Sequence, residues 1–371
     1  MARPGPLERV NRVATGAVTM PIALTRYAAT EPLFTGALLA ALTRAPIQYR
    51  SRFLKLLGDA GLSSERIALL IKSLKYLLAF GVVRRLNQAL NKLALNHWNF
   101  FGKPGAPFNW SAVNKSELVL ITGGCSGFGY EMVKSFSRHA RVIILDISPL
   151  PEELKRIQDV HYYQVDLTDF SVIESTADTI RTEHGDPTVL INNAGIATGT
   201  KIIETSAKLN DRIFKVNLAS HFVLIKEFLP GMLKARKGHI VTIASMASFM
   251  AAPGLVDYCC TKIGALYLTE GLRHELRVYH GAEGRCIQTT SVHPSWHATG
   301  IVKPFEDKLE KSGIKCDPAS NVSDAIVEQV LAGRSGRIFV PKTEEKNTGL
   351  RNFPVWLQDV VIYLNKKRFQ F

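Results

Sequence analysis

The chain has 371 residues, of which 46% are apolar and 21% charged, and this composition excludes a disordered or fibrous protein. The net charge of +14 is uneven, because residues 1–116 carry sixteen Lys and Arg against four Asp and Glu, whereas the rest of the chain is nearly neutral. The five cysteines form no CxxC pair and no metal-ligand spacing with histidine, so we expect no metal site and reduced thiols.

Residues 1–116 are predicted to form a basic, helical extension that anchors the protein to a membrane. The apolar stretch 32–42 is shorter than the roughly 20 residues that span a bilayer. Residues 66–86 are longer, but two lysines interrupt them. They are predicted to be an interfacial amphipathic helix or a hairpin arm, with Arg84 and Arg85 at the level of lipid phosphates.

The stretch NHWNFFGKPGAPFNW, residues 96–110, is aromatic and rich in turn residues, and is predicted to be an interfacial belt followed by a linker. A soluble helical subdomain packed on the body is the alternative. No nucleic-acid motif occurs, and the apolar content makes a lipid surface the expected partner. A secretory signal is not expected, and the scarcity of serine in the Arg-rich start argues against a mitochondrial leader.

From residue 117 to about 345, short runs rich in Val, Ile and Thr alternate with amphipathic stretches. Several runs are apolar on both faces, which is typical of strands in a parallel sheet, so we predict a doubly wound α/β domain. The predicted strands are 118–124, 141–146, 162–167, 188–195, 239–245, 286–292 and 337–341. The predicted helices are 128–139, 169–184, 208–235 and 260–279.

The first predicted strand ends in the glycine-rich turn TGGCSGFG. Gly123, Gly127 and Gly129 would let a pyrophosphate approach the free N–H groups of the next helix. Asp146 ends the second predicted strand, where a carboxylate suits the ribose hydroxyls of adenosine and repels a 2′-phosphate. The turn contains no basic residue, so NAD is predicted over NADP.

Polar residues also follow the third and fourth predicted strands, namely Asp166 and the NNAG stretch at 192–195. This is the edge at which open α/β sheets bind ligands. Taken singly, the aspartate could be a helix N-cap and NNAG a plain turn.

In the stretch YCCTK, a tyrosine and a lysine bracket two cysteines. A spacing of four on a helix places Tyr258 and Lys262 on one face, and leaves Cys259 and Cys260 as small buried packing residues. An ammonium group near a phenol favours the phenolate, so Lys262, helped by the positive nicotinamide, is expected to lower the pKa of Tyr258. Tyr258 could then accept a proton from an alcohol whose oxygen is hydrogen-bonded by Ser245.

Together these motifs resemble the short-chain dehydrogenase/reductase family over about 230 residues. The resemblance implies a Rossmann fold with a mostly seven-stranded parallel sheet, and a catalytic tetrad. In that tetrad Asn217 holds a water of a proton relay and Ser245 orients the substrate oxygen. Tyr258 is the acid/base, and Lys262 binds the nicotinamide ribose.

Two positions depart from the family pattern. The serine after the fifth strand follows an alanine rather than a second serine, and its spacing to the tyrosine selects Ser245 over Ser248. After the sixth strand, Pro294 is followed by Ser295 in place of glycine, whereas Thr299 matches the residue that contacts the nicotinamide amide. The predicted cofactor-binding residues are Thr122, Gly123, Ser126, Gly127, Phe128, Gly129, Asp146, Asp166, Leu167, Asn193, Ala194, Gly195, Tyr258, Lys262, Pro294 and Thr299.

Residues 295–320 are expected to cover the substrate. Their large side chains Trp296, Ile301, Val302 and Phe305 favour a bulky hydrophobic ligand, with internal packing as the alternative. Four features are similar to the branch of membrane- and lipid-droplet-associated retinol and 17β-hydroxysteroid dehydrogenases. They are the apolar leader, the LDI stretch after the second predicted strand, HPSW after the sixth, and GRIFVP near the end of the body. That likeness implies a retinoid, steroid or long-chain lipid alcohol, and a catalytic domain facing the cytosol on the endoplasmic reticulum or a lipid droplet.

The tail, residues 346–371, is amphipathic with a basic end, and is predicted to dock on a membrane or to form a homodimer contact. Two other functions stay open. One is a catalytically idle scaffold on a lipid droplet or the endoplasmic reticulum, and the other is an NADPH-dependent ketoreductase of a soluble metabolite.

Overall fold

The computed structural model describes residues 30–99, 104–311 and 313–364, so parts of the leader, of the aromatic stretch and of the basic tail lie outside the described residues. The chain divides into two compact units, Met1–Ala94 and Leu95–Phe371. The boundary thus lies before the one expected from composition at 116, because residues that follow Ala94 pack on the second unit. His97 Nε2 lies 3.2 Å from the carbonyl oxygen of Ile287 in the body.

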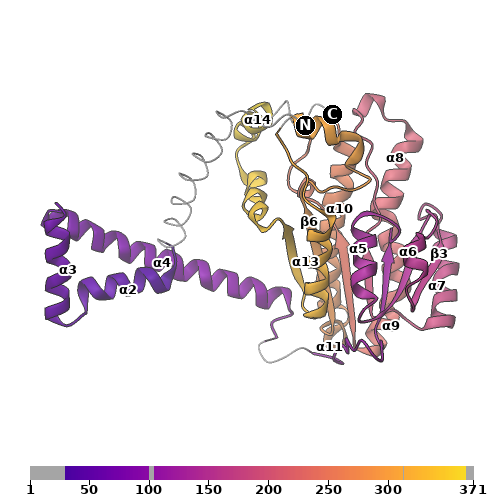
Figure 1. Ribbon diagram of the computed structural model, residues 1–371, viewed down its shortest axis with the longest axis horizontal. Helices are drawn as coiled ribbons and strands as arrows, with labels where there is room; N and C mark the ends of the chain where they lie inside the picture. Colours follow the sequence, from indigo (N-terminus) through magenta and orange to yellow (C-terminus); the bar gives the residue numbers. More distant parts are fainter. Residues whose placement is uncertain (1–29, 100–103, 312, 365–371) are drawn as a thin grey trace. The chain divides into compact units, whose positions relative to one another are not determined.

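From residue 30 on, the first unit is helical, with α2 (Pro32–Thr43), α3 (Ile47–Asp59) and α4 (Ser64–Leu95). Helix α2 lies alongside α4 (Figure 1), and Gly81 permits this approach, because a Cβ there would lie 2.6 Å from the carbonyl oxygen of Thr30. The two arginines expected at lipid phosphates have partners inside the unit. Arg85 pairs with Glu31, and Arg84 donates to the Thr30 carbonyl at 3.2 Å.

Within the described ranges, no helix combines the length and the apolar character needed to cross a membrane.

The second unit is built on a seven-stranded parallel sheet of order β3-β2-β1-β4-β5-β6-β7, which confirms the predicted doubly wound fold. The order reverses between β1 and β4, where this fold class forms its ligand crevice. All seven predicted strands agree with the structure to within three residues at each end. The strands are β1 (Leu118–Thr122), β2 (Arg141–Asp146), β3 (Val160–Gln164), β4 (Val189–Asn192), β5 (Gly238–Ile243), β6 (Ile287–Pro294) and β7 (Gly336–Val340).

Strand β3 begins and ends earlier than predicted. Its last residue, Gln164, pairs with Asp146, the last residue of β2, so the ladder ends there. The apolar residues 165 and 167 are still buried, but they point into the core from the loop after the strand. The apolar residues after Gln164 therefore made the predicted strand end three residues too late.

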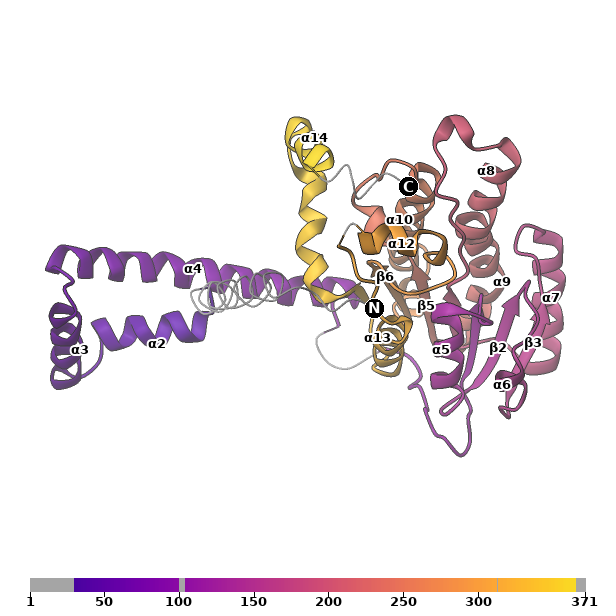
Figure 2. The same ribbon diagram turned by 45° about the horizontal axis from the view of Figure 1, so that its top comes forward.

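Helices cover both faces of the sheet (Figure 2). Helices α5 (Gly127–Phe136) and α13 (Ala319–Leu331) pack on one face, and α7 (Phe170–His184), α9 (Ser220–Ala235) and α10 (Val256–Val278) pack on the other. The β-strand side chains alternate between these two apolar cores, as the pleat requires. Shorter helices complete the unit: α6 (Glu152–Lys155), α8 (Ala207–Phe214), α11 (Gly281–Gly284), α12 (Glu306–Lys311) and α14 (Val355–Leu364).

Two helices differ from the prediction in ways that affect the site. The predicted helix 208–235 is interrupted by a π-helical turn, Lys215–Ala219, which separates α8 from α9. Helix α10 begins at Val256 rather than at 260, so the tyrosine of YCCTK lies in its first turn.

The aromatic stretch before the body is not an exposed belt where the structure describes it. The rings of Phe108 and Trp110 stack with centroids 5.3 Å apart, and Trp110 contacts Phe136 in the core. Both belong to the apolar layer under α5 and α13. Among the described aromatic residues of the stretch 96–110, Trp98 keeps a large exposed fraction, 42%.

Candidate active site

The turn between β1 and α5 has the backbone geometry of a phosphate-binding loop. Gly123 and Gly127 adopt φ values of 66° and 54°, which favour glycine. A Cβ on Gly129 would overlap the carbonyl oxygen of Gly123, so the first turn of α5 folds back onto the loop. The free N–H groups at the start of this ten-residue helix therefore face the loop's open side.

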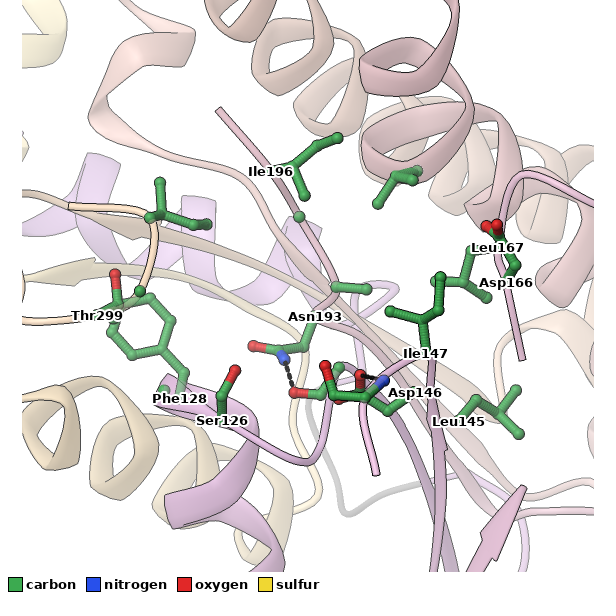
Figure 3. A pocket seen from close by; sticks show the side chains of 18 of the residues that line it. Ser126, Phe128, Leu145, Asp146, Ile147, Asp166, Leu167, Asn193, Ile196 and Thr299 are labelled. Carbon is green, nitrogen blue, oxygen red and sulfur yellow. Dashed lines mark hydrogen bonds between the residues drawn. The ribbon is translucent and has the colours of Figure 1, made fainter. Parts of the chain in front are cut away.

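A cavity of about 350 Å³ lies over this turn and extends along the carboxyl ends of β1, β2 and β4 (Figure 3). Its volume is within the usual range for a bound organic ligand. Phe128 and Thr299 lie at one end of the drawn site, and Asp166 and Leu167 at the other. The predicted cofactor residues that line it are Gly123, Ser126, Gly127, Phe128, Asp146, Asp166, Leu167, Asn193, Ala194, Gly195 and Thr299.

The other predicted cofactor residues, Thr122, Gly129, Pro294, Tyr258 and Lys262, do not line the cavity. Thr122 is fully buried, and its hydroxyl accepts hydrogen bonds from the N–H groups of Asn193 and Ala194 at 2.9 and 3.0 Å. It therefore fixes the NNAG loop to β1 from below.

Asn193 completes this clamp. Its side-chain amide donates to the carbonyls of Thr122 at 2.8 Å and Gly123 at 3.1 Å, so it joins the NNAG loop to the glycine turn. Figure 3 shows this amide reaching across the floor of the cavity.

Asp146 is held rigidly at the edge of the cavity. One carboxylate oxygen accepts from the N–H of Cys125 and the other from the N–H of Ser148, both at 2.9 Å. Burial, reinforced by the Asp146 charge, raises the pKa of the Cys125 thiol to about 12. The thiol is therefore protonated at neutral pH. The carboxyl group of Asp146 lines the cavity, at the position where the sequence predicted contact with the ribose hydroxyls.

Sequence reasoning missed nine lining residues, most of them apolar. The most informative is Arg212 of α8, an exposed cation five residues before Asn217. NAD was predicted over NADP because the glycine turn lacks a basic residue, and Arg212 lies outside that turn. Most of the others are loop or helix neighbours of predicted residues. They are Leu145, Ile147, Ser148, Val165, Ile196, Ala197, Val216 and Gly300.

Tyr258 and Ser245 meet as predicted, but the pKa of the phenol moves in the opposite direction. Burial raises the pKa of Tyr258 to about 12, and the hydrogen bond with the Ser245 side chain lowers it only partly. Lys262 lies with its Nζ 5.5 Å from the centre of the Tyr258 ring. In the protein without cofactor, burial thus outweighs the hydrogen bond with Ser245, whereas the expected lowering also involves the positive nicotinamide and stays a prediction.

Lys262 is almost completely buried, and its ammonium donates to the carbonyl of Ile243 at 2.7 Å. Burial lowers the pKa of the lysine to about 8. A Cβ on Gly195 would lie 3.4 Å from Nζ, so the ammonium reaches the loop that lines the cavity. Lys262 thus connects the buried tyrosine with the edge of the cavity.

Asn217 lies in the π-helical turn, and its side chain is fully engaged. Its oxygen accepts from the N–H of Ile196, and its amide donates to the Ile196 carbonyl, both at 2.8 Å, and to the Thr261 hydroxyl at 3.2 Å. Any water that Asn217 holds would therefore use its main chain. π-Helical turns are frequent at functional sites.

The hydroxyl of Ser245 accepts from the N–H of Ala247 at 3.1 Å and lies 3.5 Å from the Pro294 carbonyl. The alternative serine, Ser248, is buried and donates to the main-chain carbonyl of Lys262 at 2.7 Å. Ser248 is thus committed to the helix, which favours Ser245 as the residue that meets a substrate oxygen.

His293 of β6 supports Ser245 from behind. Its Nδ1 lies 3.3 Å from the main-chain oxygen of Ser245, and its Nε2 lies 3.0 Å from the Ser291 hydroxyl. The ring is packed between Phe249 and Phe339, with both centroids 5.0 Å away. Sequence reasoning gave this histidine no role.

The segment expected to cover the substrate divides between both suggested roles. Ile301 lines the cavity, whereas Trp296 packs internally with Tyr258 against Ala252 and Leu255. Val302 is half-buried, and the side chain of Phe305 lies outside the described residues. Of the two adjacent cysteines, Cys259 is buried in this cluster as predicted, but Cys260 is exposed.

Among the residues that the structure describes, no group of His, Cys, Asp and Glu could hold a metal ion.

Comparison with known proteins identifies the family. Residues 117–310, more than half of the chain, match the family described as short chain dehydrogenase. The chain belongs to this family, and is an oxidoreductase that acts on an alcohol or carbonyl, as its motifs predicted.

Two curated relatives illustrate the likeness. Dehydrogenase RED3 of Cochliobolus heterostrophus is 47% identical over 133 residues, which cover 36% of this chain and 67% of that protein. Epidermal retinol dehydrogenase 2 of Mus musculus is 32% identical over 237 residues, which cover 61% of this chain and 74% of that protein. The expected likeness to the retinol and 17β-hydroxysteroid dehydrogenase branch is confirmed.

The fold has solved counterparts. A short chain dehydrogenase/reductase from Burkholderia phymatum, determined in complex with NAD, matches with a TM-score of 0.59 at 23% identity. The match covers 68% of this chain and 97% of that one, and at this identity it supports the Rossmann fold alone.

Proposed function

We propose that the protein transfers hydride between NAD and the hydroxyl or carbonyl group of a lipophilic substrate, with Tyr258 as the acid/base. The observation that carries the proposal is the meeting of three side chains beside the Gly195 loop, which lines the cavity. Ser245 hydrogen-bonds Tyr258, and Lys262 lies against the same ring and reaches the Gly195 loop.

The cavity fits a dinucleotide. The glycine turn leaves no room for side chains where a pyrophosphate would lie, and the fixed carboxylate of Asp146 suits two ribose hydroxyls. Asn193 and Gly195 would hold the nicotinamide end close to Lys262. When bound there, the nicotinamide accepts or supplies the hydride. Arg212 is the one lining cation among the described residues, and is the residue to examine if a 2′-phosphate binds.

The chain's own groups then handle the proton. With its pKa raised to about 12, Tyr258 is protonated at neutral pH, which is the form that donates to a carbonyl oxygen. Ser245 would orient that oxygen by hydrogen bonding. Alcohol oxidation requires the phenolate, whose formation needs more positive charge than Lys262 supplies in the protein alone.

The apolar cluster around Tyr258 supports a lipophilic substrate. Ala197, Ala247 and Leu255 are small or apolar side chains packed beside the tyrosine. The likeness to retinol and 17β-hydroxysteroid dehydrogenases indicates the same class. A retinoid, steroid or long-chain alcohol would bury apolar surface at this cluster.

The test is turnover by the full-length, detergent-solubilised protein on retinols, hydroxysteroids, long-chain alcohols and their carbonyl forms, with NAD(H) and NADP(H) compared. We expect activity with NAD(H) on one lipophilic class, and its loss in Tyr258→Phe. Equal turnover in Tyr258→Phe contradicts the acid/base role. Tighter binding of NADPH than NADH, with turnover of a soluble ketone, supports the ketoreductase. Tight cofactor binding without turnover of any substrate supports the scaffold.

We also propose that the first unit associates with a membrane surface. The described part of this unit exposes many large apolar side chains, among them Leu33 at 83% and Ile47 at 75%. The same unit is strongly basic, which suits anionic lipid head groups.

A further inference from the structure

Beneath the first turns of α9, three buried side chains leave five polar atoms without a hydrogen-bond partner. They are both ring nitrogens of His221, both amide atoms of Asn192, and the hydroxyl oxygen of Thr242. Each residue is at most 1% exposed. Unpaired polar atoms at this depth are rare in native proteins because each costs its full desolvation free energy.

The strands place two of these side chains together. Asn192 and Thr242 are direct neighbours in the register of β4 and β5. Each lies two residues beyond an apolar residue, Leu190 and Ile240, that packs in the core under α9. Because strand side chains alternate between faces, Asn192 and Thr242 point to that same side of the sheet.

The helix places the third side chain over them. His221 precedes Leu224 by three residues on α9, and Leu224 packs in the same core as Leu190 and Ile240. Residues three apart share a helix face, so His221 faces the sheet one turn nearer to the carboxyl ends of the strands. That is the level of Asn192 and Thr242, which end β4 and nearly end β5.

Lys262 lies beside this group. Its ammonium donates to the carbonyl of Ile243, the residue after Thr242. Its charge also contributes, after burial, to lowering the pKa of His221 to about 3. The imidazole is therefore neutral, with one donor and one acceptor nitrogen.

We propose that Asn192, His221 and Thr242 enclose a buried water site between α9 and the sheet, next to Lys262. The group contains both donors and acceptors, as an internal water needs for its two to four hydrogen bonds. An apolar void would stay dry, but this site is polar on three sides. No protein group described near it satisfies these atoms.

The water site would hydrate the lysine from within. Burial removes the solvent that stabilises the charged form of Lys262. The dipoles of fixed water molecules would restore part of this stabilisation. His221 is thus a positioning residue that acts through water on Lys262. This consequence rests on the proposed function, in which the lysine must be charged, whereas the water site itself does not.

A crystal structure of the full-length protein at high resolution tests the site directly. We expect at least one ordered water within hydrogen-bonding distance of a His221 ring nitrogen and of Asn192 or Thr242. A dry gap overturns the proposal, and so do rotated side chains that bond one another directly.

Two variants test the consequence. His221→Leu fills a similar volume without polar atoms, and His221→Gln keeps a donor and an acceptor. We expect His221→Leu to lower the melting temperature and to reduce kcat about tenfold, and His221→Gln to restore most of both. If leucine matches or exceeds glutamine in melting temperature and kcat, the residue only packs and the proposal fails. Should Tyr258→Phe prove fully active, the ordered water and the melting temperatures still decide the inference.

Discussion

Burial of Lys262 has a consequence for stability that can be measured without substrate. Its pKa is lowered from 10.5 to about 8 in the folded protein, so between these pH values the unfolded chain binds more protons than the folded one. The free energy of unfolding must then rise with pH in this window. By pH 10 the gain is about 2 kcal/mol relative to pH 8, taking 1.36 kcal/mol per pH unit of full proton difference and allowing for partial titration at both ends.

Denaturant unfolding of the cofactor-free protein and of Lys262→Met, from pH 7 to 10, measures this gain. We expect the parent to gain stability relative to the variant as the pH rises. Tyr258 acts in the opposite sense only above pH 10, where its raised pKa makes the folded state lose stability as pH rises toward 12. Parallel curves for parent and variant would show that Lys262 titrates normally.

His293 offers a test of how Ser245 is positioned. Asparagine can place its amide nitrogen near Nδ1, and glutamine near Nε2, so the two substitutions separate the bond to Ser245 from the bond to Ser291. We expect His293→Asn to retain more kcat than His293→Gln, with both losing about 1–3 kcal/mol of stability. The opposite order of kcat would exclude a role for the Ser245 bond.

Spacing along the chain was enough to select Ser245, Tyr258 and Lys262, which lie together in the structure. Asn217 was named through the resemblance to the family, and its side chain contacts Ile196 and Thr261. Spacing could not give the direction of the Tyr258 pKa, because burial depends on packing from three other segments. It also missed Arg212, whose place at the cavity depends on where α8 turns.

At the scale of elements, apolar runs predicted all seven strands because a parallel sheet is buried on both faces. The π-helical turn at 215–219 was not predictable in this way. The extra residue of this turn leaves the apolar pattern of α8 and α9 nearly continuous. We attribute the turn to Asn217, whose side chain hydrogen-bonds the Ile196 loop. That loop is distant in sequence.

The close approach of α5 to the glycine turn makes Gly129 irreplaceable. In Gly129→Ala the new Cβ would overlap a main-chain oxygen that cannot move without opening the turn. We expect a loss of about 3 kcal/mol in the free energy of unfolding, together with the loss of NADH binding measured by fluorescence.

Gly271, in the middle of α10, is the matched control. A Cβ there meets no atom within 4 Å, so Gly271→Ala should stabilise the protein by about 1 kcal/mol through helix propensity. Similar destabilisation by both substitutions would mean that α5 does not approach the turn as closely as the structure shows.

At the scale of the whole molecule, composition separated a basic extension from a neutral enzyme but misplaced the boundary between them. Phe108 and Trp110 were assigned to a lipid interface because they are aromatic, yet they pack on the enzyme's core. Their spacing resembles neither a strand nor a helix, so the sequence had no periodic signal for burial. Exposure decides which apolar residues remain available to a membrane.

Helix α4 carries an exposed apolar face of this kind. Leu69, Tyr76, Phe80 and Val83 are each more than half exposed, and their spacings of seven, four and three place them on one face. Burying one valine side chain is worth about 1.5 kcal/mol or more, and a carboxylate at that position would also repel anionic lipid. Val83→Glu should therefore weaken binding to vesicles of anionic phospholipid at least about tenfold.

Val113→Glu makes the same chemical change at a side chain that is 90% exposed, in the second unit. In cosedimentation of the full-length protein with vesicles, we expect Val83→Glu to remain in the supernatant and Val113→Glu to pellet like the parent. Equal loss by both variants would indicate a general charge effect. Equal retention would exclude this face of α4 from the interface and direct attention to the exposed apolar side chains of α14, such as Trp356 and Leu364.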